Sequence, residues 1–268
     1  MKIQIASDLH LEYYDVYPGI NFFLEPCAPI LVLAGDICYY KHPHFLTFFR
    51  EASFYFKHVI FVPGNHEYYT STIIDLSFDG FSRVDDEIDD ILCNLQNVHI
   101  LQKSTFTIGN IKFIGTTLWC DIPDTDTRLQ DYAVTQNENF VLYKNHLMPH
   151  PKLVYNTNRD QYNWLKNELN YCKDYYTIVV THYLPSKKCI SEEFKNSSDN
   201  YLFYSRCDRL FQYTNTWVYG HTHIGKKMYD KHTIVLANPK GLPSEQNKYD
   251  KYKYDMKYTI DVPSFSMI

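Results

Sequence analysis

The sequence predicts an α/β fold in which strands pair into two stacked sheets and helices cover them from outside. Two observations indicate this class. Strand-like and helix-like segments alternate through the first third of the chain, and Ile30–Ala34 is apolar at every position, as in a parallel strand buried on both faces. No internal repeat and no linker rich in glycine, serine or proline interrupts the 268 residues. We therefore expect residues 1–268 to form one domain.

Short apolar runs predict the strands of these sheets. They are expected at Lys2–Ala6, Ile30–Ala34, Val59–Val62, Ile178–Thr181, Trp217–Tyr219 and Thr233–Ala237. Gly109 and Asn110 separate two further runs, which is a strong signal for a two-residue β-hairpin. The last run, from Tyr252 to Ile260, alternates tyrosines with charged residues, as a half-buried strand does. Its lysines favour a position at the edge of a sheet.

Apolar residues at helical spacing predict three helices. Pro43 is expected to open the first, and the second should run from Val84 to Leu95. Asn158 is expected to cap a third helix that reaches Cys172. The aspartates of the second helix should form its solvated face rather than a metal cluster: Asp85, Asp86, Asp89 and Asp90.

A polar stretch at about 121–157 has no clear period and is too long for an ordinary loop. It is therefore either partly helical or a functional cover. We favour a cover over the active site.

Composition and charge exclude several classes of protein. A net charge of −5 disfavours nucleic acid as a partner without excluding it, because such binding rests on clustered lysine and arginine. The seven cysteines include no Cys-x-x-Cys pair, which disfavours disulfides and a thiolate zinc site and favours a reducing cytoplasm. No run approaches the roughly 20 apolar residues of a membrane helix, and the amino terminus lacks the apolar segment of a signal peptide. We expect a cytoplasmic protein without a membrane partner.

Polar residues follow five of the strand-like runs directly. They are Asp8 and His10, Asp36, Asn65 and His66, His182, and His221 with His223. Open α/β sheets bind ligands just outside the carboxyl ends of their strands, so these side chains should meet in one site. Their mixture of carboxylates, imidazoles and an amide suits a divalent metal.

Seven of these residues can ligate, which is too many for one tetrahedral ion but suitable for two ions that share a bridge. Asp36 has two carboxylate oxygens and could provide that bridge. Two ions about 3.5–4 Å apart hold the attacking and leaving oxygens of a displacement at phosphorus, and they lower the pKa of bound water toward ~7. Such a site keeps a small positive charge and attracts phosphate although the chain is anionic. His66 is left to protonate the leaving oxygen or to stabilise charge on it.

The order of these motifs resembles the calcineurin-like metallophosphoesterase superfamily: Asp-x-His, Gly-Asp, Gly-Asn-His-Glu, His and Gly-His-Thr-His. The likeness spans residues 8–223, and Leu118-Trp119 and Ala237–Gly241 also resemble a compact single-domain branch. The resemblance implies a four-layer α-β-β-α sandwich of two mixed sheets, the metallo-dependent phosphatase fold. It also implies that a hydroxide held by two metals hydrolyses phosphomonoester or phosphodiester bonds of small substrates, nucleotides among them.

The resemblance also implies the ligand sets. One metal would lie on Asp8, His10, Asp36 and His223, and the second on Asp36, Asn65, His182 and His221. His66 would be the catalytic acid or the charge-stabilising group. We expect manganese, with iron, zinc, nickel or cobalt as alternatives.

The substrate contacts and two other functions stay open. Arg128 and Tyr69 are candidate substrate contacts, although a plain surface position for Arg128 and core packing for Tyr69 are alternatives. A phosphoesterase-like scaffold for protein interactions is disfavoured because every ligand is present. A nuclease is disfavoured by net charge and by the lack of the extra domains that the repair nucleases carry. The second Gly-Asp element with Asp-Arg-Gly is also missing, which puts protein phosphatase activity in doubt. A homodimer remains open.

Overall fold

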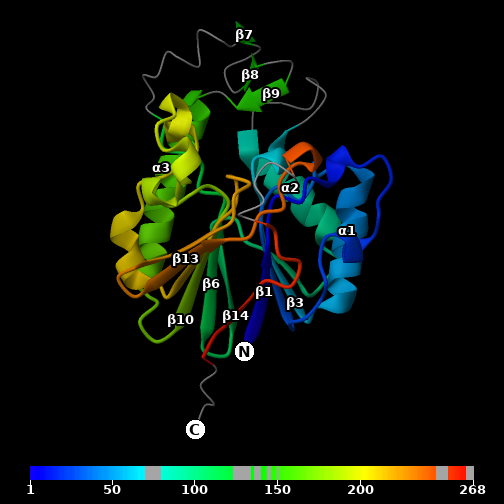
Figure 1. Ribbon diagram of the computed structural model, residues 1–268, viewed down its shortest axis with the longest axis horizontal. Helices are drawn as coiled ribbons and strands as arrows, with labels where there is room; N and C mark the ends of the chain where they lie inside the picture. Colours follow the sequence, from blue (N-terminus) through cyan, green and yellow to red (C-terminus); the bar gives the residue numbers. More distant parts are fainter. Residues whose placement is uncertain are drawn as a thin grey trace.

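The computed structural model describes residues 1–69, 80–122, 134–135, 140–143, 146–149, 151–245 and 253–263. Two mixed sheets lie face to face, with α1 (Pro43–Tyr55) and α2 (Gly80–Leu92) on one side and α3 (Pro151–Leu169) on the other (Figure 1). This arrangement confirms the predicted α/β sandwich of four layers.

The first sheet has the order β14-β1-β2-β3-β4. Its parallel strands are β1 (Lys2–Ala6), β2 (Ile30–Ala34), β3 (His58–Val62) and β4 (Val98–Ile100). The edge strand β14 (Thr259–Asp261) runs antiparallel to β1. Because the parallel strands share one direction, the loops that follow β1, β2 and β3 meet at the same edge of the sheet.

The second sheet has the order β12-β13-β11-β10-β6-β5. The strands are β5 (Ser104–Ile108), β6 (Ile111–Thr116), β10 (Tyr176–Thr181), β11 (Thr216–Val218), β12 (Lys226–Asp230) and β13 (Thr233–Ala237). β5 and β12 are antiparallel to their neighbours, and the other strands are parallel. The hairpin predicted at Gly109 and Asn110 is confirmed, and Gly109 has the positive φ of 58° that such a turn requires.

Short 3-10 segments lie between these elements. They are η1 (Leu11–Tyr13), η2 (Ile20–Phe22), η3 (His66–Tyr68), η5 (Lys187–Cys189), η6 (Glu192–Phe194), η7 (Ser198–Leu202), η8 (Asp208–Tyr213) and η9 (Pro243–Glu245). Among the described residues, no helix is both long and apolar enough to cross a membrane.

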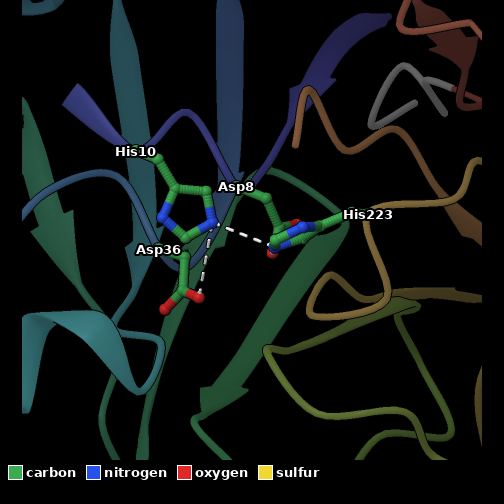
Figure 2. Close-up of side chains that lie close together, drawn as sticks. All are labelled: Asp8, His10, Asp36 and His223. Atoms are coloured by element: carbon green, nitrogen blue, oxygen red, sulfur yellow. Dashed lines mark hydrogen bonds and ion pairs between the residues drawn. The ribbon is translucent and has the colours of Figure 1, made fainter. Parts of the chain in front are cut away.

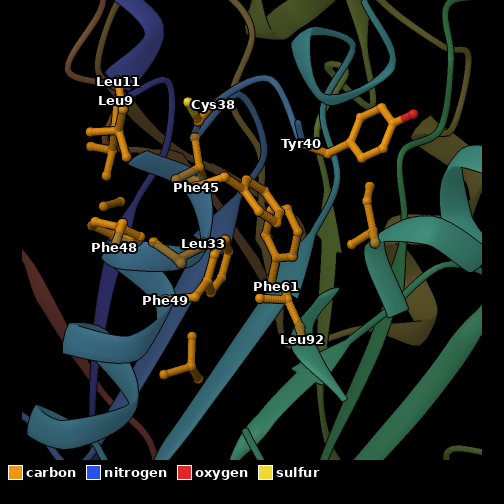
Figure 3. Packing of buried hydrophobic residues seen from close by; sticks show 14 of the residues in the cluster. Leu9, Leu11, Leu33, Cys38, Tyr40, Phe45, Phe48, Phe49, Phe61 and Leu92 are labelled. Atoms are coloured by element: carbon orange, nitrogen blue, oxygen red, sulfur yellow. The ribbon is translucent and has the colours of Figure 1, made fainter. Parts of the chain in front are cut away.

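Three apolar layers hold the sandwich together. Side chains such as Val32 and Phe113 fill the space between the sheets. Phe45, Phe49 and Phe61 pack where α1 meets the first sheet, as Figure 3 shows. Trp217 belongs to the layer that joins the second sheet to α3. Burial on this scale, at about 25 cal/mol per Å² of apolar surface, is the main stabilising term of the fold.

A small antiparallel sheet is formed by β7 (Val134–Thr135), β8 (Phe140–Tyr143) and β9 (His146–Pro149). In Figure 1 it lies at the end of the molecule toward which β1 runs. In the stretch expected to be a cover, about 121–157, residues 123–133, 136–139, 144–145 and 150 lie outside the described residues, Arg128 among them. Its last residues are helical because α3 begins at Pro151.

The predicted cap at Asn158 is wrong. Asn158 lies inside α3, and its buried amide donates hydrogen bonds to the carbonyl of Trp119 and to Ser205. Gln161, three residues further along α3, accepts a hydrogen bond from the Trp119 amide at 3.2 Å. These two polar side chains therefore make tertiary contacts with the loop after β6, and they do not cap the helix.

The strand predicted from Tyr252 to Ile260 is mostly wrong. Its first residue, Tyr252, lies outside the described part of the chain, and the observed strand begins only at Thr259. The side chains of Asn238 and Gln4 bind the backbone of Asp255 and Met256, which leaves little for strand pairing. The edge position is confirmed.

The second helix also differs in one detail from the expected solvated face. Asp86, Asp89 and Asp90 are exposed, whereas Asp85 is only partly exposed and accepts a hydrogen bond from the Tyr68 hydroxyl. Burial raises the pKa of Asp85 to about 7.

Candidate metal centre

The polar residues that follow the strands do meet, at the carboxyl ends of β1, β2, β3, β10 and β11. Several of them have φ between 49° and 73°, a region that non-glycine residues seldom adopt: Asp8, His10, Asp36, His221 and His223. Asp and His enter this region more readily than most residues. Residues held in such conformations cluster at functional sites, because the surrounding structure must enforce them.

Two glycines make room for these side chains. Gly35 has φ of 83°, and a Cβ there would lie 2.4 Å from His182 Nδ1. A Cβ on Gly220 would lie 2.8 Å from Asp8 Oδ2. Close backbone approach at both positions thus depends on the missing side chain.

A first group of ligand atoms comes from Asp8, His10, Asp36 and His223, whose atoms lie within 4.8 Å of one another. Figure 2 shows one nitrogen of the His10 ring joined by dashed lines to Asp36 and to His223. His10 Nε2 is 3.0 Å from His223 Nε2 and 3.9 Å from Asp36 Oδ2. His223 Nε2 is 3.6 Å from Asp8 Oδ1. The loop after β11 is tied to Asp8, which accepts the His221 amide at 2.9 Å.

A second group comes from Asp36, His182 and His221, again within 4.8 Å of one another. His182 Nε2 is 3.4 Å from Asp36 Oδ1 and 2.9 Å from Asn65 Oδ1. The His221 ring lies against that of Tyr183, with centroids 4.1 Å apart. The structure therefore brings together every residue that the sequence predicted as a ligand.

Asp36 belongs to both groups. Its Oδ2 faces His10 and its Oδ1 faces His182. Burial disfavours the charged form, but His182 and His66 outweigh it and hold the pKa of Asp36 well below its usual range. Asp36 is therefore a buried anion at neutral pH.

The hydrogen-bond pattern tests whether the first group suits a cation. Glu12 and Glu245 accept from Nδ1 of His10 and His223 at 3.1 and 2.6 Å. An ionised carboxylate only accepts, so both Nδ1 atoms carry hydrogen and the Nε2 lone pairs of the neutral rings face each other. Such an arrangement is repulsive without a cation between them. In the metal-free protein a proton on one Nε2 can take the place of that cation. Burial opposes protonation, but Glu245 and Asp8 raise the pKa of His223.

In the second group, too, acceptor atoms face one another at the centre of the site. The Ala34 carbonyl lies 2.8 Å from His182 Nδ1 and can only accept, so His182 Nε2 turns toward the oxygens of Asn65 and Asp36. The Asn65 amide nitrogen donates to the Tyr69 hydroxyl at 2.9 Å, which leaves Oδ1 facing inward. Burial opposes protonation, but Asp36 raises the pKa of His182 to about 9. In both groups, acceptor atoms thus point toward one another in a way that fits a divalent metal. Histidines that bind metals commonly make such hydrogen bonds through their outer nitrogen.

His66 lies beside the shared carboxylate. Its backbone amide donates to Asp36 Oδ1 at 2.8 Å, and its Nε2 is 4.0 Å from Asp36 Oδ2. Its Nδ1 is 2.9 Å from Glu12 Oε1, and the Tyr39 ring stacks on it at 5.7 Å. Burial opposes protonation, but Asp36 and the hydrogen bond to Glu12 raise the pKa of His66.

Three glutamates were not predicted as parts of this site. Glu67 is fully buried and accepts the backbone amides of Asp36, Ile37, Cys38 and Gly64 at 2.6–3.2 Å. It clamps the loop after β2 to the loop after β3. Glu12 and Glu67 stand inside the motifs Asp-Leu-His-Leu-Glu and Gly-Asn-His-Glu, so a signal was present. Glu245 lies 22 residues from His223, and no sequence signal indicates it.

The two candidate substrate contacts have different outcomes. Arg128 lies outside the described residues, as stated above. Tyr69 is partly buried, with its hydroxyl on Asn65 and its ring 5.0 Å from that of His66. Tyr69 therefore orients Asn65, a candidate ligand residue, and a substrate contact for Tyr69 remains a prediction.

The comparisons with known proteins agree with this geometry. The family model for calcineurin-like phosphoesterases matches residues 1–225. An uncharacterized protein from Acanthamoeba polyphaga mimivirus is 26% identical over 274 residues, which cover 94% of this chain and 95% of that protein. The crystal structure of phosphopantetheinyl hydrolase from Mycobacterium tuberculosis has the same fold, with a TM-score of 0.70, 18% identity and 94% of each chain covered. Because the family model spans most of the chain, this protein belongs to the calcineurin-like phosphoesterases and is a metal-dependent hydrolase of phosphate esters.

Proposed function

We propose that the protein hydrolyses small phosphomonoesters or phosphodiesters, nucleotides among them, with two divalent ions that share Asp36. One observation carries this proposal: the two oxygens of Asp36 face different ligand groups, at 3.9 Å from His10 Nε2 and 3.4 Å from His182 Nε2. A buried carboxylate with one oxygen toward each group is suited to bridge two cations.

The residues divide between the ions as the two groups do. Asp8, His10 and His223 would join Asp36 around one ion, and Asn65, His182 and His221 around the other. When bound, such ions polarise a phosphoryl oxygen and lower the pKa of water, so that a nucleophile is available at neutral pH. Manganese accepts this mixture of carboxylate, imidazole and amide ligands, and it is the ion we propose first.

His66 would donate the proton that the leaving oxygen needs. Burial opposes protonation of His66, but the neighbouring Asp36 raises its pKa and so favours the protonated form that can donate. Its side chain is 18% exposed, so it can reach a substrate at the edge of the site. A proton passed from His66 to the leaving oxygen avoids a free alkoxide, which contributes about 10²–10⁴-fold to a rate.

Aromatic side chains around the site could accept a ring or base on the substrate. Tyr13 is 50% exposed and its ring lies 5.9 Å from that of His10. The Phe203 ring lies 5.0 Å from that of His221. The cover proposed at about 121–157 would complete the substrate pocket.

A hydrolysis panel with Mn²⁺ tests the proposal. It compares an aryl phosphomonoester, an aryl phosphodiester, cyclic nucleotides, a phosphopantetheinyl ester and single-stranded DNA, after metal analysis of the purified protein. The phosphopantetheinyl ester is included because the structural relative is named for that hydrolysis. We expect two metals per chain and turnover of at least one small ester that Asp36→Asn abolishes. A metal-loaded protein without turnover would support the scaffold, and DNA as the best substrate would support the nuclease.

A further inference from the structure

Glu12 touches two histidines that come from different loops. It lies in η1, and its Oε1 is 3.1 Å from His10 Nδ1 and 2.9 Å from His66 Nδ1. His10 follows β1 and His66 follows β3, and their rings meet edge to face with centroids 4.5 Å apart. The Glu12 side chain is 3% exposed, so water competes little for these hydrogen bonds.

This single oxygen decides which nitrogen of each ring carries hydrogen. Oε1 is the atom that both Nδ1 atoms reach, and one carboxylate oxygen can accept two hydrogen bonds, whereas a protonated one could donate only one. An ionised carboxylate accepts and never donates, so both Nδ1 atoms carry hydrogen. Both Nε2 atoms then point toward Asp36 Oδ2, at 3.9 Å from His10 and 4.0 Å from His66.

Glu12 and Glu67 both have buried side chains, but they have different hydrogen-bond partners. Among the described residues, the hydrogen bonds to Glu67 all come from backbone amides, so it shapes loops and does not bind a side chain that faces the site. Glu12 Oε1 instead binds two imidazoles whose opposite nitrogens have chemical roles. A ring that can bind through either nitrogen needs such a partner to present the correct one.

We propose that Glu12 is a positioning residue that keeps hydrogen on Nδ1 of both His10 and His66, so that Nε2 of each ring faces the centre, as a metal ligand in His10 and as the proton donor in His66. One carboxylate oxygen thus aligns a metal ligand with the proton donor. The role of His66 in turnover rests on the proposed function, whereas the tautomers of the two rings do not.

The test uses Glu12→Leu, which keeps the volume and removes the acceptors, and Glu12→Gln, whose amide oxygen can still accept. Glu51→Leu is the matched control, because Glu51 Oε2 also accepts two hydrogen bonds, from the Tyr17 hydroxyl and the Ile20 amide, but away from the metal centre. The first readout is ¹⁵N NMR of the histidine side chains in the metal-free full-length protein, at a pH high enough that both rings are neutral and their tautomers can be distinguished. We expect Glu12→Leu to change the tautomer populations of His10 and His66, and Glu12→Gln and Glu51→Leu to preserve them.

The second readout is kcat at saturating Mn²⁺ for esters with good and poor leaving groups. Poor leaving groups depend on the acid, so Glu12→Leu should lower kcat for an alkyl ester on the order of 10²-fold and for a nitrophenyl ester less than tenfold. Glu51→Leu should leave both rates unchanged.

Unchanged tautomers in Glu12→Leu, or equal losses for both leaving groups, would overturn the proposal. If Glu12→Leu does not fold, Glu12→Asp replaces it, since the shorter side chain withdraws the carboxylate while retaining its charge. Glu12→Asp is then expected to change the same tautomers, and wild-type tautomers in it would equally overturn the proposal. Should the wild type hydrolyse no ester, the proposed function fails while the NMR measurement still decides the role of Glu12.

Discussion

The two ligand groups meet at Asp36 but are supported by different kinds of atom. In the first group, the outer nitrogens of His10 and His223 bind the carboxylates of Glu12 and Glu245. We refer to it as the carboxylate-supported group. In the second group, His182 binds the Ala34 carbonyl and Asn65 binds the Tyr69 hydroxyl. This is the neutral-supported group.

The difference concerns how strongly each group attracts a cation. A carboxylate on the outer nitrogen makes an imidazole a more basic ligand. Asp8 adds a further anion that belongs only to the carboxylate-supported group. The neutral-supported group relies on the shared Asp36 for its negative charge. We therefore expect two ions of unequal affinity at a site that appears symmetric in its ligand count.

The largest effect should follow from Asp36→Asn, which removes the anion common to both groups. We expect a loss of more than about 10³-fold in kcat/KM, or about 4 kcal/mol, together with loss of metal from both groups. Metal analysis and steady-state kinetics check this, with the exposed Asp90→Asn as control. A variant that keeps two metals and most of its activity would show that Asp36 is not a bridge.

His66→Ala should lower kcat on the order of 10²-fold while the protein keeps two metals, because His66 is proposed to act on the leaving group. Turnover and metal content are measured on the same sample. Loss of metal would instead show that His66 is a ligand. In that case His10, Glu12 and His66, which also lie close together, would form a third group of ligands beside the two compared above.

The outer contacts can be compared directly with a matched pair of variants. Glu245→Gln removes the charge behind His223 and should weaken metal binding about 10–100-fold. Tyr69→Phe removes a neutral hydroxyl behind Asn65 and should weaken it about two- to tenfold, as the loss of one ordinary hydrogen bond does. Calorimetric titration of metal into each metal-free variant measures both. Equal losses would remove the distinction between the groups.

The smallest effect is the difference between the two affinities themselves. His182→Ala leaves the carboxylate-supported group intact, and His223→Ala leaves the neutral-supported group intact. We expect the ion that remains in His182→Ala to bind about tenfold more tightly, a difference of 1.4 kcal/mol. Competition with a chelator of known affinity gives both constants, and the reverse order would contradict the electrostatic argument.

Much of the fold and the meeting of the candidate ligand residues could be predicted from the sequence, for a physical reason. Parallel strands buried on both faces are apolar throughout, as at Ile30–Ala34, so the polar residues at their ends stand out. The chain direction of parallel strands then brings those ends together. Local patterns also sufficed for α1 and for the hairpin at Gly109, since both depend on neighbouring residues.

Features that depend on distant contacts could not be predicted in this way. Asn158 resembles a helix cap in the sequence, yet its partners are Trp119 and Ser205. In the sequence, Glu245 cannot be distinguished from an ordinary surface glutamate, because only the fold brings it to His223. The tautomer of each histidine follows from such contacts, so the distinction between the two groups required the structure.

The ligand residues come from both sheets, and this has a consequence for folding. His10 and His223 are 213 residues apart in the chain, and each reaches the centre only when its own sheet has formed and the two sheets have packed. Contacts of such long range form late, because a large loop must close first. The centre is therefore complete only in the finished molecule. A cation held there would join the ends of that loop much as a covalent crosslink does, and would slow the separation of the two halves of the sandwich.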